Sequence, residues 1–291
     1  MLGILLVDKP QGLTSHDVVN RVRRILSTKR VGHAGTLDPM ATGLLVVAVG
    51  PATRFLQYLP LEPKVYEARI AFGQSSTTYD AEGELSESKP VPEDLLAAAK
   101  DKVGEFEGLI EQMPPMFSAI KIQGQPLYKY ARMGKEIVRE SRRVHIGRFE
   151  LTQDDEPNVL RAEIECSGGT YIRSLAHDLG NAIGVGAHLV GLRRTRVGLF
   201  HVEDACTLDE VNESRLIQLS EALPPMPLVQ IDEVQTQAIR EGRSITVSEI
   251  PPNRLVALVE SRGHVFSVAR LEGKSLQPEC VIPAEVFDGA L

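Results

Sequence analysis

The sequence predicts an α+β fold in which a mixed central β-sheet is flanked by helices and followed by a small, β-rich C-terminal domain. Three observations predict it: segments that alternate apolar and polar residues, segments with apolar residues at helical spacing, and a proline-rich break before a strand-rich end. At 291 residues the chain can form one large domain or two unequal ones. Its composition, 43% hydrophobic and 24% charged, is that of a globular protein and argues against disorder.

The N-terminal segment predicts a buried strand over Ile4–Val7, a turn in DKPQGLTS, and then a helix that begins near Thr14 or Ser15. Ser15 is a suitable N-cap residue. Apolar residues recur at helical spacing on one face of this helix: Val18, Val22, Ile25 and Leu26. The glycine-rich segment GHAGTLDPMATG, residues 32–43, predicts a loop that enters the buried strand LLVVAVG.

The middle of the chain alternates strand and helix patterns. KVYEARIAFG predicts a half-buried strand because apolar side chains recur at every second position, and RVHIGRFEL and LRAEIEC have the same period. PEDLLAAAKDKV and YIRSLAHDLGNAIG predict helices; the latter places Ile172, Leu175, Ala176, Leu179 and Ile183 on one stripe. Three prolines in LPPMP, residues 223–227, disfavour helix and central strand. We therefore expect domains over residues 1–225 and 228–291, with strands in ITVSEI, RLVALVES and HVFSVARL.

Several function classes lose support because their motifs are missing. No apolar run approaches the roughly 18 residues of a membrane span, and the N-terminus does not have the pattern of a secretory signal, so we expect a cytoplasmic protein. The sequence has no phosphate-binding GxxxxGK[ST], complete dinucleotide fingerprint, GxSxG or HExxH. The three cysteines are far apart, and we expect them to be inert buried thiols.

The charge distribution keeps nucleic acid open as a partner despite a net charge of -7. Residues 118–202 hold thirteen Lys or Arg against nine acids, whereas residues 203–291 hold seven against fifteen. An acidic protein can therefore present a basic face to phosphates, although a scattered, solvated surface accounts for these counts equally well.

Asp38 is the main candidate for chemistry, because glycines and Pro39 bracket a single carboxylate in the 32–43 loop. His33, Tyr66, Tyr171 and Arg173 could complete a site, since an arginine holds a carboxylate ionised and a tyrosine can stack on a base. Each residue also has an ordinary structural explanation. Asp38 can be a turn residue, His33 a hydrogen-bonded loop histidine, Tyr66 and Tyr171 core aromatics, and Arg173 a surface charge.

Six motifs, in order, closely resemble those of the TruB family of tRNA pseudouridine synthases. They are DKPQGLTSHDVV, RVGHAGTLDPMATGLLVVAVG, KVYEARIAFGQSSTTYDAEG, MPPMFSAIKIQGQPLYKYARMGKEI, CSGGTYIRSLAHDLG and LRRTRVGLF. They span about residues 7–200, and the C-terminal part resembles more weakly the PUA-like RNA-binding domain of that family. The resemblance implies a pseudouridine-synthase fold and isomerisation of uridine 55 in the tRNA T-loop, after base flipping, without metal or cofactor.

The resemblance also implies roles for individual residues. Asp38 matches the essential aspartate and Arg173 the arginine that pairs with it. Tyr66 and Tyr171 match tyrosines that line the uracil pocket, with Tyr66 stacking on the base and a candidate for the final C5 deprotonation.

Further positions match family residues with supporting roles: His33 beside the flipped nucleotide, Leu192 in the pocket, Lys9 in a structural motif and Asp80 in YDAEG. The basic insertion over residues 118–148 matches a segment that closes over the T-arm. Phe117 departs from the pattern, since many members carry tyrosine there, which puts any hydroxyl role in doubt.

Two alternatives remain open from the sequence. A noncatalytic RNA-binding protein or tRNA chaperone would use the same basic cleft, but the presence of Asp38, Arg173, Tyr66 and Tyr171 favours the enzyme. Another RNA could be the substrate in place of tRNA, although the PUA-like C-terminal domain favours tRNA. We expect a monomer.

Overall fold

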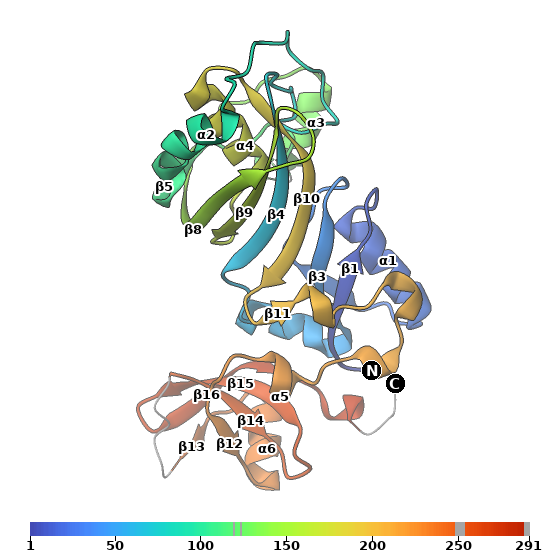
Figure 1. Ribbon diagram of the computed structural model, residues 1–291. Helices are drawn as coiled ribbons and strands as arrows, with labels where there is room; N and C mark the ends of the chain where they lie inside the picture. The colour runs from blue at the N-terminus through green and yellow to red at the C-terminus, as the bar shows by residue number, and fades with distance from the viewer. Residues whose placement is uncertain (119, 123, 248–253, 288–291) are drawn as a thin grey trace. The chain divides into compact units, whose positions relative to one another are not determined.

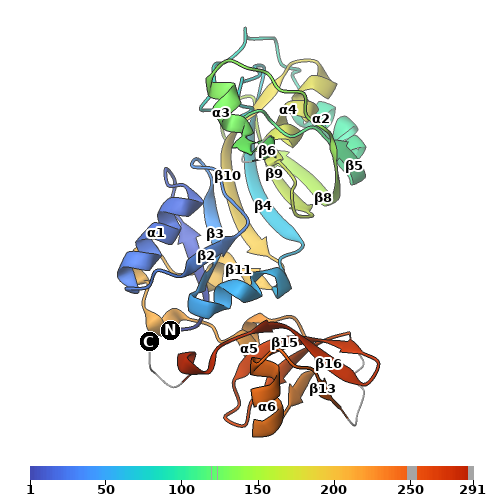
Figure 2. The same ribbon diagram turned by 180° about the vertical axis from the view of Figure 1, so that it is seen from behind.

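The chain forms two compact units, each assembled from separate stretches of sequence. In the computed structural model, which describes residues 1–118, 120–122, 124–247 and 254–287, unit 1 comprises Met1–Asp38, Leu45–Pro60 and Asp204–Leu291. Unit 2 comprises Pro39–Leu44 and Leu61–Glu203. Figures 1 and 2 show the ribbon from opposite sides, with the elements labelled.

Unit 2 is built on an antiparallel sheet with the order β10-β4-β9-β8-β5. The strand β4 (Lys64–Phe72), between β10 and β9, has the predicted alternation, with Tyr66, Ala68, Ile70 and Phe72 all buried. Because β4 is paired along both edges, its backbone is held over nearly its whole length. The other strands are β5 (Gly108–Gln112), β8 (Arg142–Gln153), β9 (Val159–Cys166), β10 (Ala187–Val197) and the short β11 (Phe200–His201).

Two helices of unit 2, α2 (Leu95–Val103) and α4 (Ile172–Ile183), contact each other, α2 packing on β8 and α4 on β10 (Figure 1). Of the predicted stripe on α4, Ile172, Leu175, Ala176 and Leu179 are buried, whereas Ile183 at the C-terminal end is half-buried. The predicted 92–103 helix starts later, because Asp94 is its N-cap. η2 (Gly104–Phe106) lies between α2 and β5, and β6 (Lys121–Ile122), β7 (Gln125–Pro126) and α3 (Leu127–Arg132) lie between β5 and β8.

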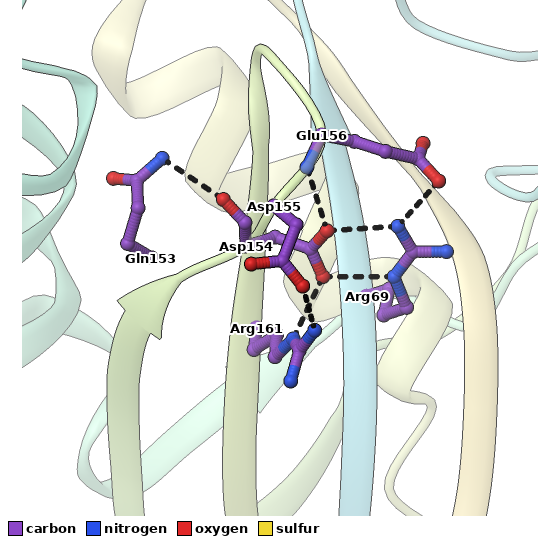
Figure 3. A network of polar contacts seen from close by, with 6 residues as sticks. All are labelled: Arg69, Gln153, Asp154, Asp155, Glu156 and Arg161. Carbon is purple, nitrogen blue, oxygen red and sulfur yellow. Dashed lines mark hydrogen bonds and ion pairs between the residues drawn. The ribbon is translucent and has the colours of Figure 1, made fainter.

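A carboxylate pins the β8–β9 turn to the middle of the unit 2 sheet. Figure 3 shows Asp154 receiving the guanidinium groups of Arg69 on β4 and Arg161 on β9. The three Arg to Asp154 hydrogen bonds are 2.9 Å long, and the Asp154 side chain is 1% exposed. The Arg69 hydrogen bonds and the Glu156 backbone N–H hold the pKa of Asp154 well below its usual range, so the turn is fixed at neutral pH.

The first residues of β3 (Thr42–Val49) join the unit 2 sheet through tight backbone packing. Thr42 and Gly43 pair in parallel with Arg193 and Arg194 of β10, which makes the sheet mixed as predicted. The fully buried Arg194 donates its Nε–H to the Leu44 carbonyl at 2.8 Å. Gly43 has a φ of +98°, and a Cβ placed there would lie 2.3 Å from the Arg194 carbonyl oxygen.

The N-terminal part of unit 1 contains β1 (Gly3–Lys9), α1 (Ser15–Ile25), β2 (Val31–Ala34) and the rest of β3, with β1 and β2 both paired to β3. The predicted cap at Ser15 is wrong: Thr14 is the N-cap and forms a capping box with Asp17, so Ser15 is the first helical residue. Val18, Val22 and Leu26 are buried as expected, whereas Ile25 is 46% exposed. Residues 32–34, predicted as loop, belong to β2.

The remaining unit 1 elements include a five-stranded sheet near the C-terminus, with the order β12-β14-β15-β16-β13. The predicted strands ITVSEI, RLVALVES and HVFSVARL correspond to β13, β14 and β15, although residues 248–250 of the first lie outside the described residues. Sequence patterning missed β12, β16 and α6, which packs on β16. The bounds are β12 (Leu228–Gln230), α6 (Glu233–Arg240), β13 (Ile245–Thr246), β14 (Leu255–Val259), β15 (Val265–Glu272) and β16 (Ser275–Val281).

Short helical turns complete the secondary structure. They are η1 (Gly50–Tyr58), η3 (Val202–Asp204), η4 (Leu208–Glu210), η5 (Glu213–Arg215), α5 (Leu219–Ala222) and η6 (Ala284–Val286). All three cysteines are free and buried, and burial raises the thiol pKa of Cys166 and Cys280 to about 11, as expected of inert thiols. Within the described ranges, none of the helices has the length and apolarity that crossing a bilayer requires.

We predict that Gly43→Ala destabilises the protein by about 2 kcal/mol or more, because it adds left-handed strain to a backbone clash with Arg194. The matched control is Gly104→Ala, where φ is -61° and no atom lies within 4 Å of the added Cβ. Urea unfolding of both variants measures the difference. Equal stability of the two variants would contradict this account of the β3–β10 contact.

Candidate functional site

The guanidinium of Arg173 joins three segments of unit 2. Arg173 lies in the first turn of α4 and is 4% exposed. Its Nη1 donates to the Asp80 carboxylate and to the Thr78 carbonyl, each at 3.1 Å, and its Nη2 donates to the Phe117 carbonyl at 2.9 Å. The last contact uses the Phe117 backbone, so it does not depend on whether phenylalanine or tyrosine stands there.

Asp80, the partner of Arg173, is held by its own turn. One carboxylate oxygen accepts from the Thr78 hydroxyl and from the Glu82 backbone N–H, and the other faces Arg173. Asp80 is 3% exposed and forms a backbone bridge with Leu189 on β10. A buried carboxylate held by this many donors keeps the facing guanidinium in one place.

A second contact ties the same turn to α4. Tyr79 has a φ of +64° and stacks on His177, with the ring centroids 3.8 Å apart. His177 lies one helical turn after Arg173. Two adjacent turns of α4 therefore contact two consecutive residues: Arg173 binds Asp80, and His177 stacks on Tyr79. Burial lowers the pKa of His177, which leaves the stacked ring neutral at pH 7. Sequence reasoning missed this stack, and only the four-residue spacing of Arg173 and His177 hinted at it.

Tyr171, at the N-cap of α4, is fixed through its backbone by Gln112. The Tyr171 N–H donates to Gln112 Oε1 at 2.8 Å, and the Gln112 amide donates back to the Tyr171 carbonyl at 3.0 Å. The Arg142 guanidinium carbon lies 5.4 Å from the centre of the Tyr171 ring. Gln112, which is 1% exposed, was not among the predicted site residues. No sequence pattern marks a buried glutamine whose side chain hydrogen-bonds to the backbone of a distant residue.

Tyr66 and Leu192 come together through strand register. Tyr66 on β4 is paired with Arg194 on β10, and Ala68 is paired with Leu192. Residues paired directly across an antiparallel ladder, and residues two apart on one strand, point to the same face. The side chains of Tyr66 and Leu192 are therefore diagonal neighbours, although 126 positions separate them in the sequence.

Asp38 is the last residue of the first stretch of unit 1 and lies in the loop that follows β2. It is half-buried, and its predecessor Leu37 is 3% exposed. The Ser15 hydroxyl accepts from the Leu37 N–H at 2.8 Å and donates to the Leu37 carbonyl at 3.2 Å. The loop therefore has an anchor next to Asp38.

The other predicted unit 1 residues flank this loop in sequence. His33 is half-buried on β2, opposite Val47 of β3. Lys9 ends β1 and is fully buried, with its ammonium donating to the carbonyls of Pro10 and Leu13 at 3.0 and 2.6 Å. Lys9 thus closes the DKPQGLTS turn, in keeping with the structural role expected of it.

The structure brings the predicted site residues together in two pairs within unit 2, Asp80 with Arg173 and Tyr66 with Leu192. Asp38, His33 and Lys9 belong to unit 1. The pairing of Asp38 with Arg173 stays a prediction. In the part of the chain that the structure describes, no group of three His, Cys, Asp or Glu side chains is arranged to hold a metal ion.

Comparison with known proteins identifies the family. A family model described as the TruB family pseudouridylate synthase N-terminal domain matches residues 23–172, and one for the tRNA pseudouridylate synthase B C-terminal domain matches residues 173–227. A Thermobifida fusca protein named tRNA pseudouridine synthase B is 47% identical over 277 residues, covering 89% of this chain and 94% of that protein. The chain belongs to the TruB family of pseudouridine synthases.

Other relatives extend the likeness over nearly the whole chain. The Mycobacterium tuberculosis protein named tRNA pseudouridine synthase B is 42% identical over 294 residues, which cover 99% of this chain and 98% of that protein. Among solved structures, the "Crystal Structure of a Cbf5-Nop10-Gar1 Complex" matches with a TM-score of 0.70 and 28% identity, covering 97% of this chain and 86% of that one. The predicted fold class is confirmed, and this TruB family member is an enzyme of the isomerase class.

We predict that Asp80→Asn lowers the free energy of unfolding by about 3 kcal/mol, because it removes a buried carboxylate that faces the Arg173 guanidinium. The control is Glu105→Gln in the exposed Lys102–Glu105 pair, where we expect a loss below about 1 kcal/mol. Urea unfolding at pH 7 measures both. Losses of similar size would show that the buried pair contributes no more than a surface pair.

We predict a pH-dependent effect of Asp178→Asn on α4. Burial raises the pKa of Asp178 to about 6, above its ordinary value of 3.8. The folded state therefore takes up a proton more readily, and the contribution of Asp178 to stability falls as pH rises from about 4 to 6. Allowing for its partial exposure, the variant should be about 1–2 kcal/mol more stable than the parent at pH 7 and equal to it near pH 4. Thermal unfolding across this range measures it, and a difference independent of pH contradicts it.

Proposed function

We propose that the protein isomerises uridine 55 in the T-loop of tRNA to pseudouridine and that Asp38 is the catalytic carboxylate. The observation that carries the proposal is the loop G-T-L-D-P, which presents one half-buried carboxylate between the Ser15 anchor and Pro39. The choice of tRNA is supported by near full-length relatives named tRNA pseudouridine synthase B.

The isomerisation requires from the protein one carboxylate and a pocket that holds the uracil. The N1–C1′ glycosidic bond breaks, the uracil rotates while it is held, and a C5–C1′ bond forms. The proton that leaves C5 is balanced by one gained at N1, so the reaction is redox-neutral and needs no co-reactant. Asp38 acts at the sugar, either by adding to C1′ or by removing the 2′ proton, and both routes require it ionised.

Arg173 supplies the positive charge that keeps Asp38 ionised in this proposal. The guanidinium is already oriented by Asp80 and by two carbonyls, so it does not have to reorganise when the carboxylate reacts. The supporting role of Asp80 is to hold that guanidinium. The Tyr79–His177 stack keeps the Asp80 turn against α4.

The uracil pocket is formed by the face of β4 and β10 that carries Tyr66 and Leu192, together with Tyr171. Tyr66 stacks on the flipped base and its phenol is suited to the last step, removal of the C5 proton. Since β4 is paired along both edges, Tyr66 comes from a strand that the sheet holds in place.

The remaining residues bind the RNA around the base. His33 supports the flipped-out nucleotide and Lys9 holds the adjacent DKPQGLTS turn. The basic insertion over residues 118–148 contacts the phosphates of the T-arm, and its last residues, from Arg142, form the start of β8. The C-terminal sheet over residues 228–291 acts as the PUA-like accessory domain. We propose that one monomer suffices for the reaction, without cofactor or metal.

We predict that Asp38→Asn lowers isomerisation by at least about 10²–10⁴-fold while leaving folding and RNA affinity largely unchanged, since the amide keeps the size but loses the negative charge. The measurement is tritium release from a T-arm transcript labelled at uracil C5, because isomerisation must exchange that hydrogen.

A transcript with cytidine at the target position is the control and should release nothing. Isomerisation by the variant at the parent rate would count decisively against Asp38. A parent protein that binds the transcript and releases no tritium would favour the noncatalytic RNA-binding alternative or another RNA substrate.

A further inference from the structure

One hydroxyl satisfies both backbone groups of the residue before Asp38. Ser15 Oγ accepts from the Leu37 N–H at 2.8 Å and donates to the Leu37 carbonyl at 3.2 Å, across 22 positions of sequence. Ser15 is 1% exposed and Leu37 3% exposed. Buried backbone groups outside a helix or sheet need partners, and here one side chain supplies both.

This contact fixes the orientation of the peptide that leads into Asp38. The Leu37 carbonyl and the Asp38 N–H share one planar peptide group, so holding the carbonyl holds the plane from which Asp38 projects. On the other side, Pro39 restricts the backbone of Asp38 to the extended region. The two constraints leave the Asp38 carboxylate little freedom beyond rotation of its own side chain.

Ser15 is available for this role because Thr14 caps the helix. The Thr14 hydroxyl accepts from the Asp17 N–H, and the Asp17 carboxylate accepts back from the Thr14 N–H, so the hydroxyl of Ser15 is not needed at the helix end. The helix is anchored by Val18 and Val22, which are fully buried in the unit 1 core. The hydroxyl therefore projects from a rigid element onto the loop.

We propose that Ser15 is a positioning residue for Asp38, which sets the direction of the reacting carboxylate through the backbone of Leu37. The proposal rests on the proposed function of Asp38. Ser15 acts through Leu37, so its loss should slow the chemical step without weakening RNA binding. Displacement of a reacting group by about 1 Å can cost about 10²-fold in rate.

The test compares Ser15→Ala with the parent by C5 tritium release, by RNA affinity and by hydrogen exchange at the Leu37 amide. We expect kcat to fall about 10- to 100-fold, with KM and RNA affinity within about twofold of the parent. Exchange at the Leu37 amide should become faster, because its hydrogen-bond acceptor is gone. Ser15→Cys keeps a side chain of similar shape whose hydrogen bonds are weaker, so we expect an intermediate kcat. This variant provides the test if Ser15→Ala does not fold.

The matched control is Cys206→Ala. Cys206 is 2% exposed, belongs to the same hydrophobic cluster as α1, and its thiol contacts the Leu6 carbonyl at 3.5 Å. The substitution removes one buried heavy atom and one weak backbone contact from that core without touching the loop. It should leave kcat and Leu37 exchange unchanged, which separates positioning from a general loss of stability.

The outcomes distinguish this inference from the proposed function. Parent kcat in both Ser15 variants, in a protein that Asp38→Asn inactivates, would overturn the positioning role and leave the proposed function standing. A fall in kcat matched by Cys206→Ala would also overturn it. Tritium release that is absent from the parent would overturn the proposed function and the positioning role with it, whatever the exchange data show.

Discussion

The buried guanidinium of Arg173 is the interaction on which the organisation of unit 2 around α4 depends. A charged group this far from water needs polar partners, and both terminal nitrogens of the guanidinium have them: the Thr78 carbonyl and the Asp80 carboxylate in the 76–84 turn, and the Phe117 carbonyl. These partners come from segments that are far apart in the sequence, and the Tyr79–His177 stack adds a second contact between the turn and α4. The buried Arg173 guanidinium therefore holds the turn, the segment at Phe117 and α4 together.

In both units, buried side chains that hydrogen-bond to backbone groups do much of the positioning. Gln112 binds both polar groups of Tyr171, Lys9 closes its own turn through two carbonyls, and Ser15 holds Leu37. Such contacts fix where a neighbouring residue points without occupying the space that a substrate needs. Asp38, one of the groups proposed to react, thus follows a residue that a buried side chain holds, whereas Tyr66 is held by the pairing of β4 along both edges.

The parts of the fold that could be predicted are those where periodicity is strong. The alternation in β4 and the apolar stripe of α4 follow directly from burial of one face, and both are confirmed. The predicted N-cap of α1 was wrong because Thr14 and Ser15 are both residue types that cap helices well. The choice between them depends on a long-range contact, the hydrogen bond of Ser15 with Leu37. β12 was missed because its three residues carry too little pattern, and β16 because Pro278 and its polar neighbours interrupt the alternation.

The candidate site likewise contains residues that the sequence marked and residues that it did not. The motifs mark Asp38, Arg173 and the tyrosines as candidates, because these residues lie in recognisable segments. Gln112, Tyr79 and His177 were missed, since each acts through a long-range contact that leaves no local signal. The partner of Arg173 that the structure gives, Asp80, lies 93 positions away, and strand register rather than spacing brings Tyr66 beside Leu192.

The composition of unit 1 from three stretches of chain has a consequence for the order of folding during translation. The first strand, β1, forms backbone bridges from Ile4 to Ile217 and from Val7 to Cys206, partners that a ribosome synthesises about 200 residues later. Unit 2, in contrast, consists entirely of residues up to 203. One edge of β1 can pair with β3 early in synthesis, but its other edge must wait for its partners until the C-terminal part of unit 1 emerges.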